Sequence, residues 1–133
     1  MQTILYIEDN LYNTQLIQRL LSQRPEIELL VSDTGRAGFS LAHEYRPALI
    51  LLDVHLPDVT GYDVFTTLRE DPRTSSIPVV ILSADATPGQ SSRFLNAGAE
   101  GYLTKPLDLT LLLHTIDTVL RATERDSDIA TEA

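Results

Sequence analysis

Five short apolar runs, spaced at fairly even intervals, constrain the fold of this 133-residue chain more than any other feature. The third run reads Ala-Leu-Ile-Leu-Leu and the fourth reads Val-Val-Ile-Leu, so apolar residues follow one another without alternating polar positions. Continuous runs of this kind are typical of strands that are buried on both faces of a sheet. We therefore expect five buried strands, at Thr3–Ile7, Ile27–Val31, Ala48–Leu52, Val79–Leu82 and Gly101–Thr104.

Each run is followed by a segment in which apolar residues recur with helical period. Gly98 is placed to end the fourth helix, and Asp108 is placed to cap the fifth. Alternating strands and helices imply a parallel sheet with right-handed crossovers. The expected fold is therefore α/β, a flavodoxin-like three-layer (βα)5 sandwich with a five-stranded sheet. The positions expected to share one face of each helix are Asn13, Leu16, Ile17, Leu20 and Leu21; Gly38, Leu41, Ala42 and Tyr45; Val64, Phe65 and Leu68; Phe94, Leu95 and Ala97; and Leu109, Leu112, Leu113, Ile116 and Leu120.

Charge and composition exclude several classes of function. Ten basic residues against 19 acidic ones give a net charge of −9, which argues against sequence-independent binding to nucleic acid or to anionic lipid. The chain has no cysteine, so disulfides and zinc–thiolate sites are excluded. Glu8 and Asp9 interrupt the only early apolar stretch, and no run approaches the roughly 20 residues of a membrane span. We expect a cytoplasmic domain over residues 1–122 and a polar, disordered tail over residues 123–133.

Polar residues that could bind a ligand or take part in catalysis follow four of the five expected strands. In an open parallel sheet, ligands bind beyond the carboxyl ends of the strands. Three carboxylates at one edge repel one another unless a cation is present, and Mg²⁺ prefers such oxygen ligands. A lysine and a hydroxyl beside them supply a charge and a donor for an anionic ligand, which are the parts that phosphoryl transfer requires. These residues are Glu8 and Asp9 after the first strand, Asp53 after the third, Ser83 after the fourth and Lys105, the only lysine, after the fifth.

The motifs around these positions resemble those of response-regulator receiver domains of two-component phosphorelay signalling, of the single-domain or hybrid-kinase type. Asp53 lies in Leu-Leu-Asp-Val-His-Leu-Pro-Asp-Val-Thr-Gly, Ser83 in Ile-Leu-Ser-Ala-Asp-Ala, and Lys105 in Gly-Tyr-Leu-Thr-Lys-Pro-Leu. Together with the acidic pair Glu8-Asp9 they occur in the family's order, and the resemblance covers about residues 2–122.

The resemblance implies that a phosphoryl group passes from a phosphohistidine of a histidine kinase or a phosphotransfer protein to Asp53. Lys105 would pair with the phosphoryl oxygens, and the Ser83 hydroxyl would bind one of them. Such domains catalyse their own phosphorylation and slow dephosphorylation, without turnover of an external substrate. The bound ion would be Mg²⁺, for which Mn²⁺ can substitute, held by Glu8, Asp9, Asp53 and the backbone carbonyl of His55.

The resemblance also implies a switch. Ser83 would move toward the phosphoryl group and Tyr102 would turn inward, and a downstream protein would read the face formed by the fourth helix, fifth strand and fifth helix. Tyr102 could instead be a packed strand residue that does not switch. His55 and Asp85, two residues after Asp53 and Ser83, are candidates for tuning dephosphorylation or are ordinary loop residues. Residues with structural roles would be Pro57, Gly61 and Pro106, the last after a bond that is often cis in the family.

Three alternatives remain. A receiver-like interaction module that is never phosphorylated would not need the acidic set and Lys105. A small Mg²⁺-dependent phosphatase with an aspartate nucleophile would need a second acid where this chain has His55. A flavodoxin-like cofactor binder would share the fold but would need a phosphate loop after the first strand, where Glu8, Asp9 and Asn10 would repel a phosphate.

Overall fold

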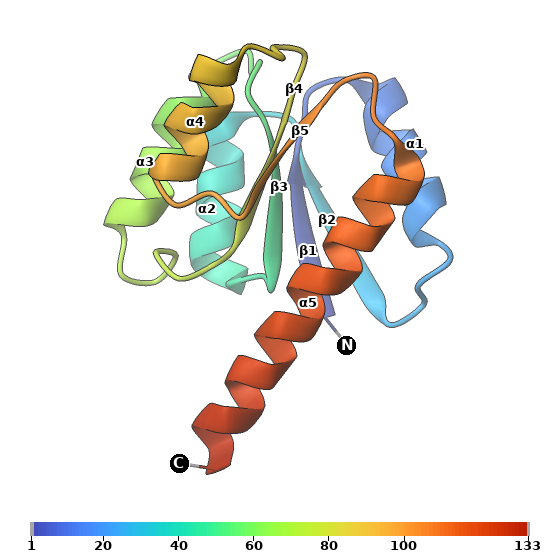
Figure 1. Cartoon of the computed structure of the whole chain (residues 1–133), viewed down its shortest axis with the longest axis vertical. Coiled ribbons are helices and arrows are strands. Elements are labelled where there is room, and N and C mark those ends of the chain that lie inside the picture. The colour runs from blue at the N-terminus through green and yellow to red at the C-terminus, as the bar shows by residue number, and fades with distance from the viewer. Residues whose placement is uncertain (1, 133) are drawn as a thin grey trace.

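Five strands and five helices alternate along the chain, in the order that the sequence predicts (Figure 1). The computed structural model describes residues 2–132, with side chains as far as Glu124. The strands are β1 Gln2–Ile7, β2 Ile27–Ser32, β3 Leu49–Asp53, β4 Val79–Ser83 and β5 Gly101–Thr104. The helices are α1 Leu11–Leu21, α2 Gly35–Tyr45, α3 Gly61–Glu70, α4 Pro88–Asn96 and α5 Leu109–Glu132.

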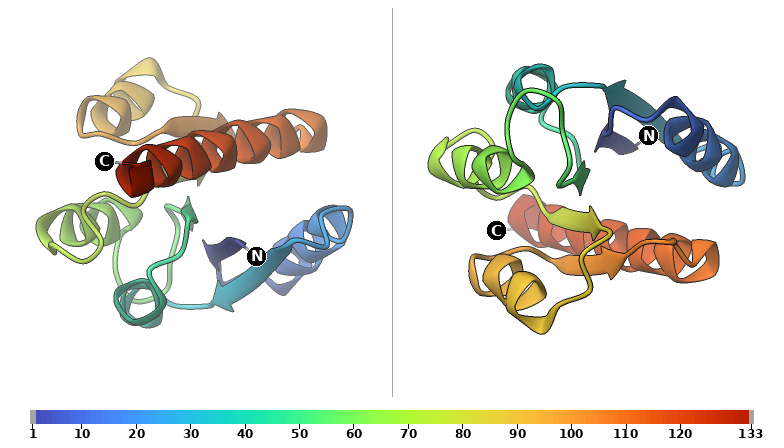
Figure 2. Two further views of the ribbon diagram at one scale, coloured as in Figure 1. Left: turned by 90° about the horizontal axis from the view of Figure 1, so that it is seen from below. Right: turned by 90° about the horizontal axis from the view of Figure 1, so that it is seen from above.

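The strands form one parallel sheet in the order β2-β1-β3-β4-β5. Helices α1 and α5 cover one face, and α2, α3 and α4 cover the other (Figure 2). This is the predicted three-layer flavodoxin-like fold. The strand order reverses between β1 and β3, so their carboxyl ends flank the crevice where ligands bind in open sheets of this kind.

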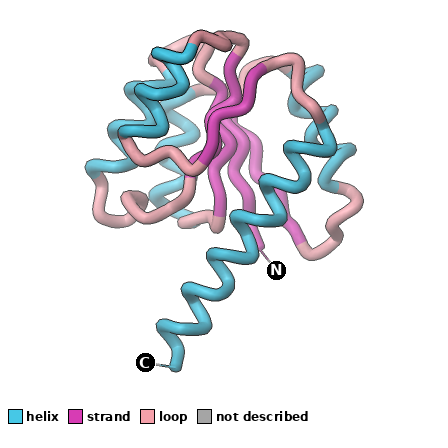
Figure 3. Tube along the Cα trace, viewed as in Figure 1, coloured by secondary structure: helices cyan, strands magenta, loops and turns pink. Residues whose placement is uncertain are grey.

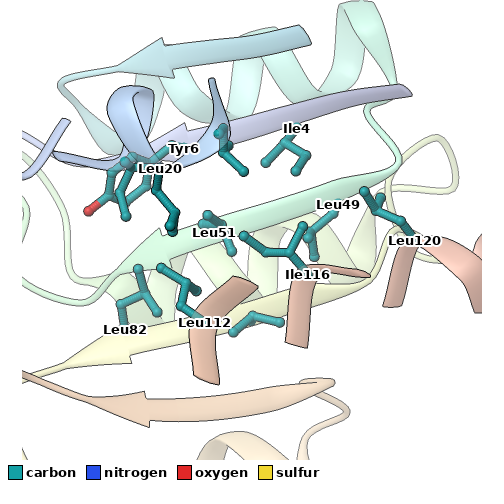
Figure 4. Packing of buried hydrophobic residues seen from close by; sticks show 12 residues of the cluster. Ile4, Tyr6, Leu20, Leu49, Leu51, Leu82, Leu112, Ile116 and Leu120 are labelled. Atoms are coloured by element: carbon teal, nitrogen blue, oxygen red, sulfur yellow. The ribbon is translucent and has the colours of Figure 1, made fainter. Parts of the chain in front are cut away.

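Burial on both faces explains why the strand sequences are apolar without alternation. All five residues of β3 and all five of β4 are buried. Alternate residues point to opposite faces, so Leu49 and Leu51 pack toward α1 and α5 (Figure 4), whereas Ile50 and Leu52 pack toward α2, α3 and α4. Each face therefore has its own apolar core.

The helix ends follow the predicted signals. The Asp108 carboxylate accepts a hydrogen bond from the Leu111 N–H at 3.1 Å, and Gly98 follows α4 with φ +106°. Three positions of the predicted apolar faces are wrong, because Tyr45 is 56% and Leu95 is 45% exposed, and Ala97 is exposed as well. Tyr45 is the last residue of α2, Leu95 lies in the last turn of α4, and Ala97 directly follows α4. At these helix ends the side chains extend beyond the apolar core.

Helix α5 continues to Glu132, into the segment 123–133 that is predicted from the sequence to be a disordered tail (Figure 3). No glycine or proline follows Pro106, so the sequence has no strong signal that would stop the helix earlier. The division of the chain at residue 122 stays a prediction. Within the described residues, no helix has both the length and the apolar character that crossing a membrane requires.

Candidate functional site

Asp53 ends β3 at the carboxyl edge of the sheet, and its side chain is only 1% exposed. Its Oδ1 accepts a hydrogen bond from the His55 N–H at 2.6 Å. Its Oδ2 accepts a hydrogen bond from the Lys105 ammonium. Both oxygens therefore have fixed partners, and the carboxylate is held at the strand end.

Glu8 follows β1 directly and is buried, at 2% exposure. Three donors bind its Oε1: Asn13 Nδ2 at 2.6 Å, the Tyr6 hydroxyl at 3.3 Å and Lys105 Nζ at 3.3 Å. Burial raises the pKa of Glu8, and the charge of Asp53 adds to this, while Asn13 and Lys105 oppose it. Burial and the same two carboxylates raise the pKa of Tyr6, so its hydroxyl keeps the proton that it donates.

Lys105 lies just after β5, at the same edge of the sheet, and its ammonium binds both carboxylates. Burial lowers the pKa of Lys105, but Asp53 and Glu8 raise it further, so the net shift is upward. The ammonium therefore keeps its charge at neutral pH. The following bond, Lys105–Pro106, is cis, as the resemblance implies.

The donor set fits a hard divalent cation. Glu8 and Asp53 already share one cation, the Lys105 ammonium, and Asp9 is exposed at the next position along the chain. Carboxylate oxygens with water access are the ligands that Mg²⁺ prefers. Among the side chains that the structure describes, as far as Glu124, no three His, Asp or Glu residues form a ready-made cluster for a metal ion, so the predicted set is not fully assembled.

Ser83 ends β4, next to β3, and is fully buried. Its hydroxyl accepts a hydrogen bond from the Asp85 N–H at 3.0 Å. The Lys105 N–H donates to the Ser83 carbonyl at 2.8 Å, which joins the ends of β4 and β5. The fold thus brings Ser83 to the same edge as Asp53 and Lys105.

Tyr102 is half-buried in β5, with its ring 5.9 Å from that of Phe94. Its hydroxyl donates to the Asp85 carbonyl at 2.6 Å. The Asp85 carboxylate accepts from the Thr87 N–H and hydroxyl at 2.9 and 2.7 Å, which together with nearby His55 lowers the pKa of Asp85. The side chains of His55 and Asp85 are therefore exposed neighbours, and Asp85 is bound to its own loop.

The loop after Asp53 is fixed at two points. A Cβ on Gly61 would collide with the backbone of Val54, so only glycine fits there. The Asp58 carboxylate accepts hydrogen bonds from the Gly35 and Arg36 N–H groups at 2.8 and 3.0 Å, and so joins the loop to the start of α2. Pro57 is exposed between these points. The close approach of Val54 gives a steric reason for glycine at position 61, and the structural roles of Pro57 and Gly61 stay predictions.

Tyr6 and Asn13 as partners of Glu8, and Asp58 as the link to α2, were not predicted from the sequence. Asn13 is a polar residue among the apolar positions of a predicted helix face, and this was the one signal in the sequence that it has a polar partner. Tyr6 looked like one more apolar residue in a buried run. Nothing in the sequence pattern pointed to the contacts of Asp58.

Comparison with known proteins agrees with the geometry. Residues 4–117 match the family model described as response regulator receiver domain. The polar-differentiation response regulator DivK of Brucella anthropi is 33% identical over 119 residues, covering 90% of this chain and 96% of that protein. A signal receiver domain from Vibrio parahaemolyticus shares the fold, with TM-score 0.88 at 24% identity over 96% of each chain. The receiver domain of a sensor histidine kinase from Pseudomonas aeruginosa, with a magnesium ion coordinated in its active site cleft, is 28% identical with TM-score 0.79, over 90% of this chain and 97% of that one.

Proposed function

This chain belongs to the response-regulator receiver family, and from that premise we propose that it accepts a phosphoryl group on Asp53 from a phosphohistidine. The donor would be a histidine kinase or a histidine phosphotransfer protein. One observation carries the proposal: Asp53 is buried at a strand end, and one of its oxygens binds the only lysine of the chain.

In the proposed transfer, an Asp53 oxygen attacks phosphorus, the phosphorus–nitrogen bond of the phosphohistidine breaks, and the electron pair leaves with the imidazole. The His55 N–H fixes Oδ1 of Asp53, which orients the carboxylate. The Lys105 ammonium, which binds Asp53, would offset the negative charge that accumulates on the phosphoryl oxygens. Phosphoryl transfer depends mostly on such positioning and charge neutralisation.

A divalent ion, Mg²⁺ or Mn²⁺, would supply further neutralisation of the phosphoryl charge when bound. The residues that would hold it are Glu8, Asp9, Asp53 and the backbone carbonyl of His55. The shared cation position of Glu8 and Asp53 supports this assignment. The magnesium ion in the sensor kinase receiver domain from Pseudomonas aeruginosa also supports it.

The signal would leave the site through Ser83 and Tyr102. Two hydrogen bonds join these residues, because the Asp85 N–H donates to the Ser83 hydroxyl and the Asp85 carbonyl accepts from Tyr102. Movement of Ser83 toward a phosphoryl group would therefore act on the Tyr102 hydroxyl. A downstream protein would read the resulting change on the face of α4, β5 and α5.

Intact mass after incubation with Mg²⁺ and acetyl phosphate tests the proposal. We expect the mass of one phosphoryl group on the wild-type chain, no gain for Asp53→Asn, and a normal gain for the loop control Asp58→Asn. An equal gain in Asp53→Asn would contradict it. No gain in the wild type would favour an unphosphorylated interaction module, and continued release of inorganic phosphate by catalytic amounts of protein would favour a phosphatase.

A further inference from the structure

Three hydrogen-bond donors, from β1, from α1 and from the segment after β5, converge on a single oxygen of Glu8. All of them bind Oε1, and none of the hydrogen bonds among the described residues uses Oε2. Among the described residues, every fully buried side-chain oxygen or nitrogen has a hydrogen-bond partner. Because Oε2 has none, it cannot be fully buried and must account for part of the small exposed area of Glu8. The carboxylate is thus held by three donors at Oε1, whereas Oε2 has no donor among the described residues and lies at the small exposed part of the side chain.

We propose that Asn13 and Tyr6 are positioning residues that orient the Glu8 carboxylate so that Oε2 is free for the divalent ion. This inference rests on the proposed function, because it assigns roles toward the metal site of that function. Neither residue would contact the ion, and neither would take part in the transfer itself.

Both donors are rigidly placed. Asn13 lies in the first turn of α1, and its own N–H donates to the capping residue Asn10 at 3.0 Å. Tyr6 is fully buried in β1, two residues before Glu8 and therefore on the same side of the chain. Their positions do not depend on Glu8, so they can fix it.

Glutamate needs such support because its side chain has more rotatable bonds than aspartate, and ordering it costs rotamer entropy. Partners that orient a metal ligand affect cation affinity by roughly 10- to 100-fold in metal sites of known proteins. We expect Asn13→Ala to weaken Mg²⁺ binding about tenfold, within that range. Tyr6→Phe removes only the longer of the two hydrogen bonds and should weaken binding by a smaller factor.

Isothermal titration calorimetry with MgCl₂ measures the Mg²⁺ affinity of each variant directly. It uses the whole chain, at a temperature where every variant is folded. The matched control is Gln15→Ala, an exposed position on the same helix, which should bind as the wild type does. In a Glu8→Gln background, Asn13→Ala should cause no further loss, because no carboxylate remains to be oriented. If Asn13 only stabilised the fold, Asn13→Ala would lower the melting temperature, and its effect on Mg²⁺ binding would not depend on Glu8.

Wild-type Mg²⁺ affinity in both Asn13→Ala and Tyr6→Phe would overturn the inference, as would an equal loss in the Glu8→Gln background. If those variants bind Mg²⁺ normally while the wild type accepts a phosphoryl group on Asp53, only the positioning role fails. If the wild type binds no Mg²⁺ at all, both the positioning role and the metal site of the proposed function fail.

Discussion

The Lys105 ammonium binds the carboxylate of Asp53 across 52 positions of sequence, from the end of β5 to the end of β3. Strand β4 lies between them in the sheet, so the lysine side chain reaches over the end of β4. The same ammonium lies 3.3 Å from Glu8 Oε1, on the far side of Asp53. One cation therefore offsets the repulsion between two buried carboxylates.

Removing this cation should slow phosphorylation without removing the acceptor. We expect Lys105→Met to slow labelling by acetyl phosphate by on the order of a hundredfold, the size typical of losing one group that stabilises developing charge. A time course of intact mass in saturating Mg²⁺ measures it. Lys105→Arg keeps the charge and should lose less. Labelling of Lys105→Met at the wild-type rate would show that the ammonium has no part in the transfer.

Asp58 should make stability depend on pH. The Arg36 and Gly35 N–H groups bind its carboxylate and hold the pKa of Asp58 below its ordinary value of 3.8. A carboxyl with a lowered folded-state pKa adds stability at higher pH, and that addition is lost as the pH falls through the folded-state pKa. Asp58→Asn should therefore reduce the free energy of unfolding at pH 7, and the gap to the wild type should close below pH 3.8.

Urea denaturation at pH 7 and again well below pH 3.8 measures both gaps. Asp33→Asn, at an exposed position shortly before α2, is the matched control, and its free energy of unfolding at pH 7 should equal that of the wild type. A deficit of the same size at both pH values would mean that the ionised carboxylate of Asp58 contributes no stability of its own.

The sequence predicted the strands to within one residue at each end, because burial on both faces leaves a continuous apolar run. It also predicted that Glu8, Asp9, Asp53, Ser83 and Lys105 meet at one edge, because parallel strands carry their carboxyl ends to the same side. Glu8 and Asp53 do share Lys105 there, with Ser83 at the same edge, whereas Asp9 is exposed beside Glu8. The contacts of Asn13 and Asp58 could not be predicted, since they depend on where a helix face or a loop lies against a neighbouring element. Periodicity gives the face of a helix but not the atom that its side chain reaches.

Gly61 should tolerate no larger residue. A Cβ there would collide with the Cα of Val54, to whose carbonyl the Gly61 N–H also donates at 3.1 Å. Forcing an extra carbon into a tight contact costs about 1–3 kcal/mol, and we expect Gly61→Ala to lower the free energy of unfolding by an amount in this range. Gly89→Ala is the matched control, because no atom beyond its chain neighbours and the backbone of its own helix lies within 4 Å of its added carbon. Equal urea midpoints for Gly61→Ala and the wild type would contradict the collision.

Tyr102 should report the state of Asp53 through the loop that holds Asp85. The Tyr102 hydroxyl and the Ser83 hydroxyl bind the two backbone groups of Asp85, at 2.6 and 3.0 Å. Beryllofluoride, added with Mg²⁺, mimics the phosphoryl group on Asp53. It should therefore shift the ring signals of Tyr102 in an NMR spectrum of tyrosine-labelled protein. The signals of Tyr45, exposed at the end of α2, should not move.

The Ser83→Ala variant separates this coupling from direct effects of the added ions. It removes the hydroxyl that binds the Asp85 N–H, so binding at Asp53 should persist while the shift of the Tyr102 signals becomes smaller. Tyr102 signals that stay in place while the wild-type site saturates would mean that this tyrosine only packs against Phe94. A full shift in Ser83→Ala would instead mean that the signal reaches Tyr102 without Ser83, because the chain of hydrogen bonds through Asp85 would already be broken.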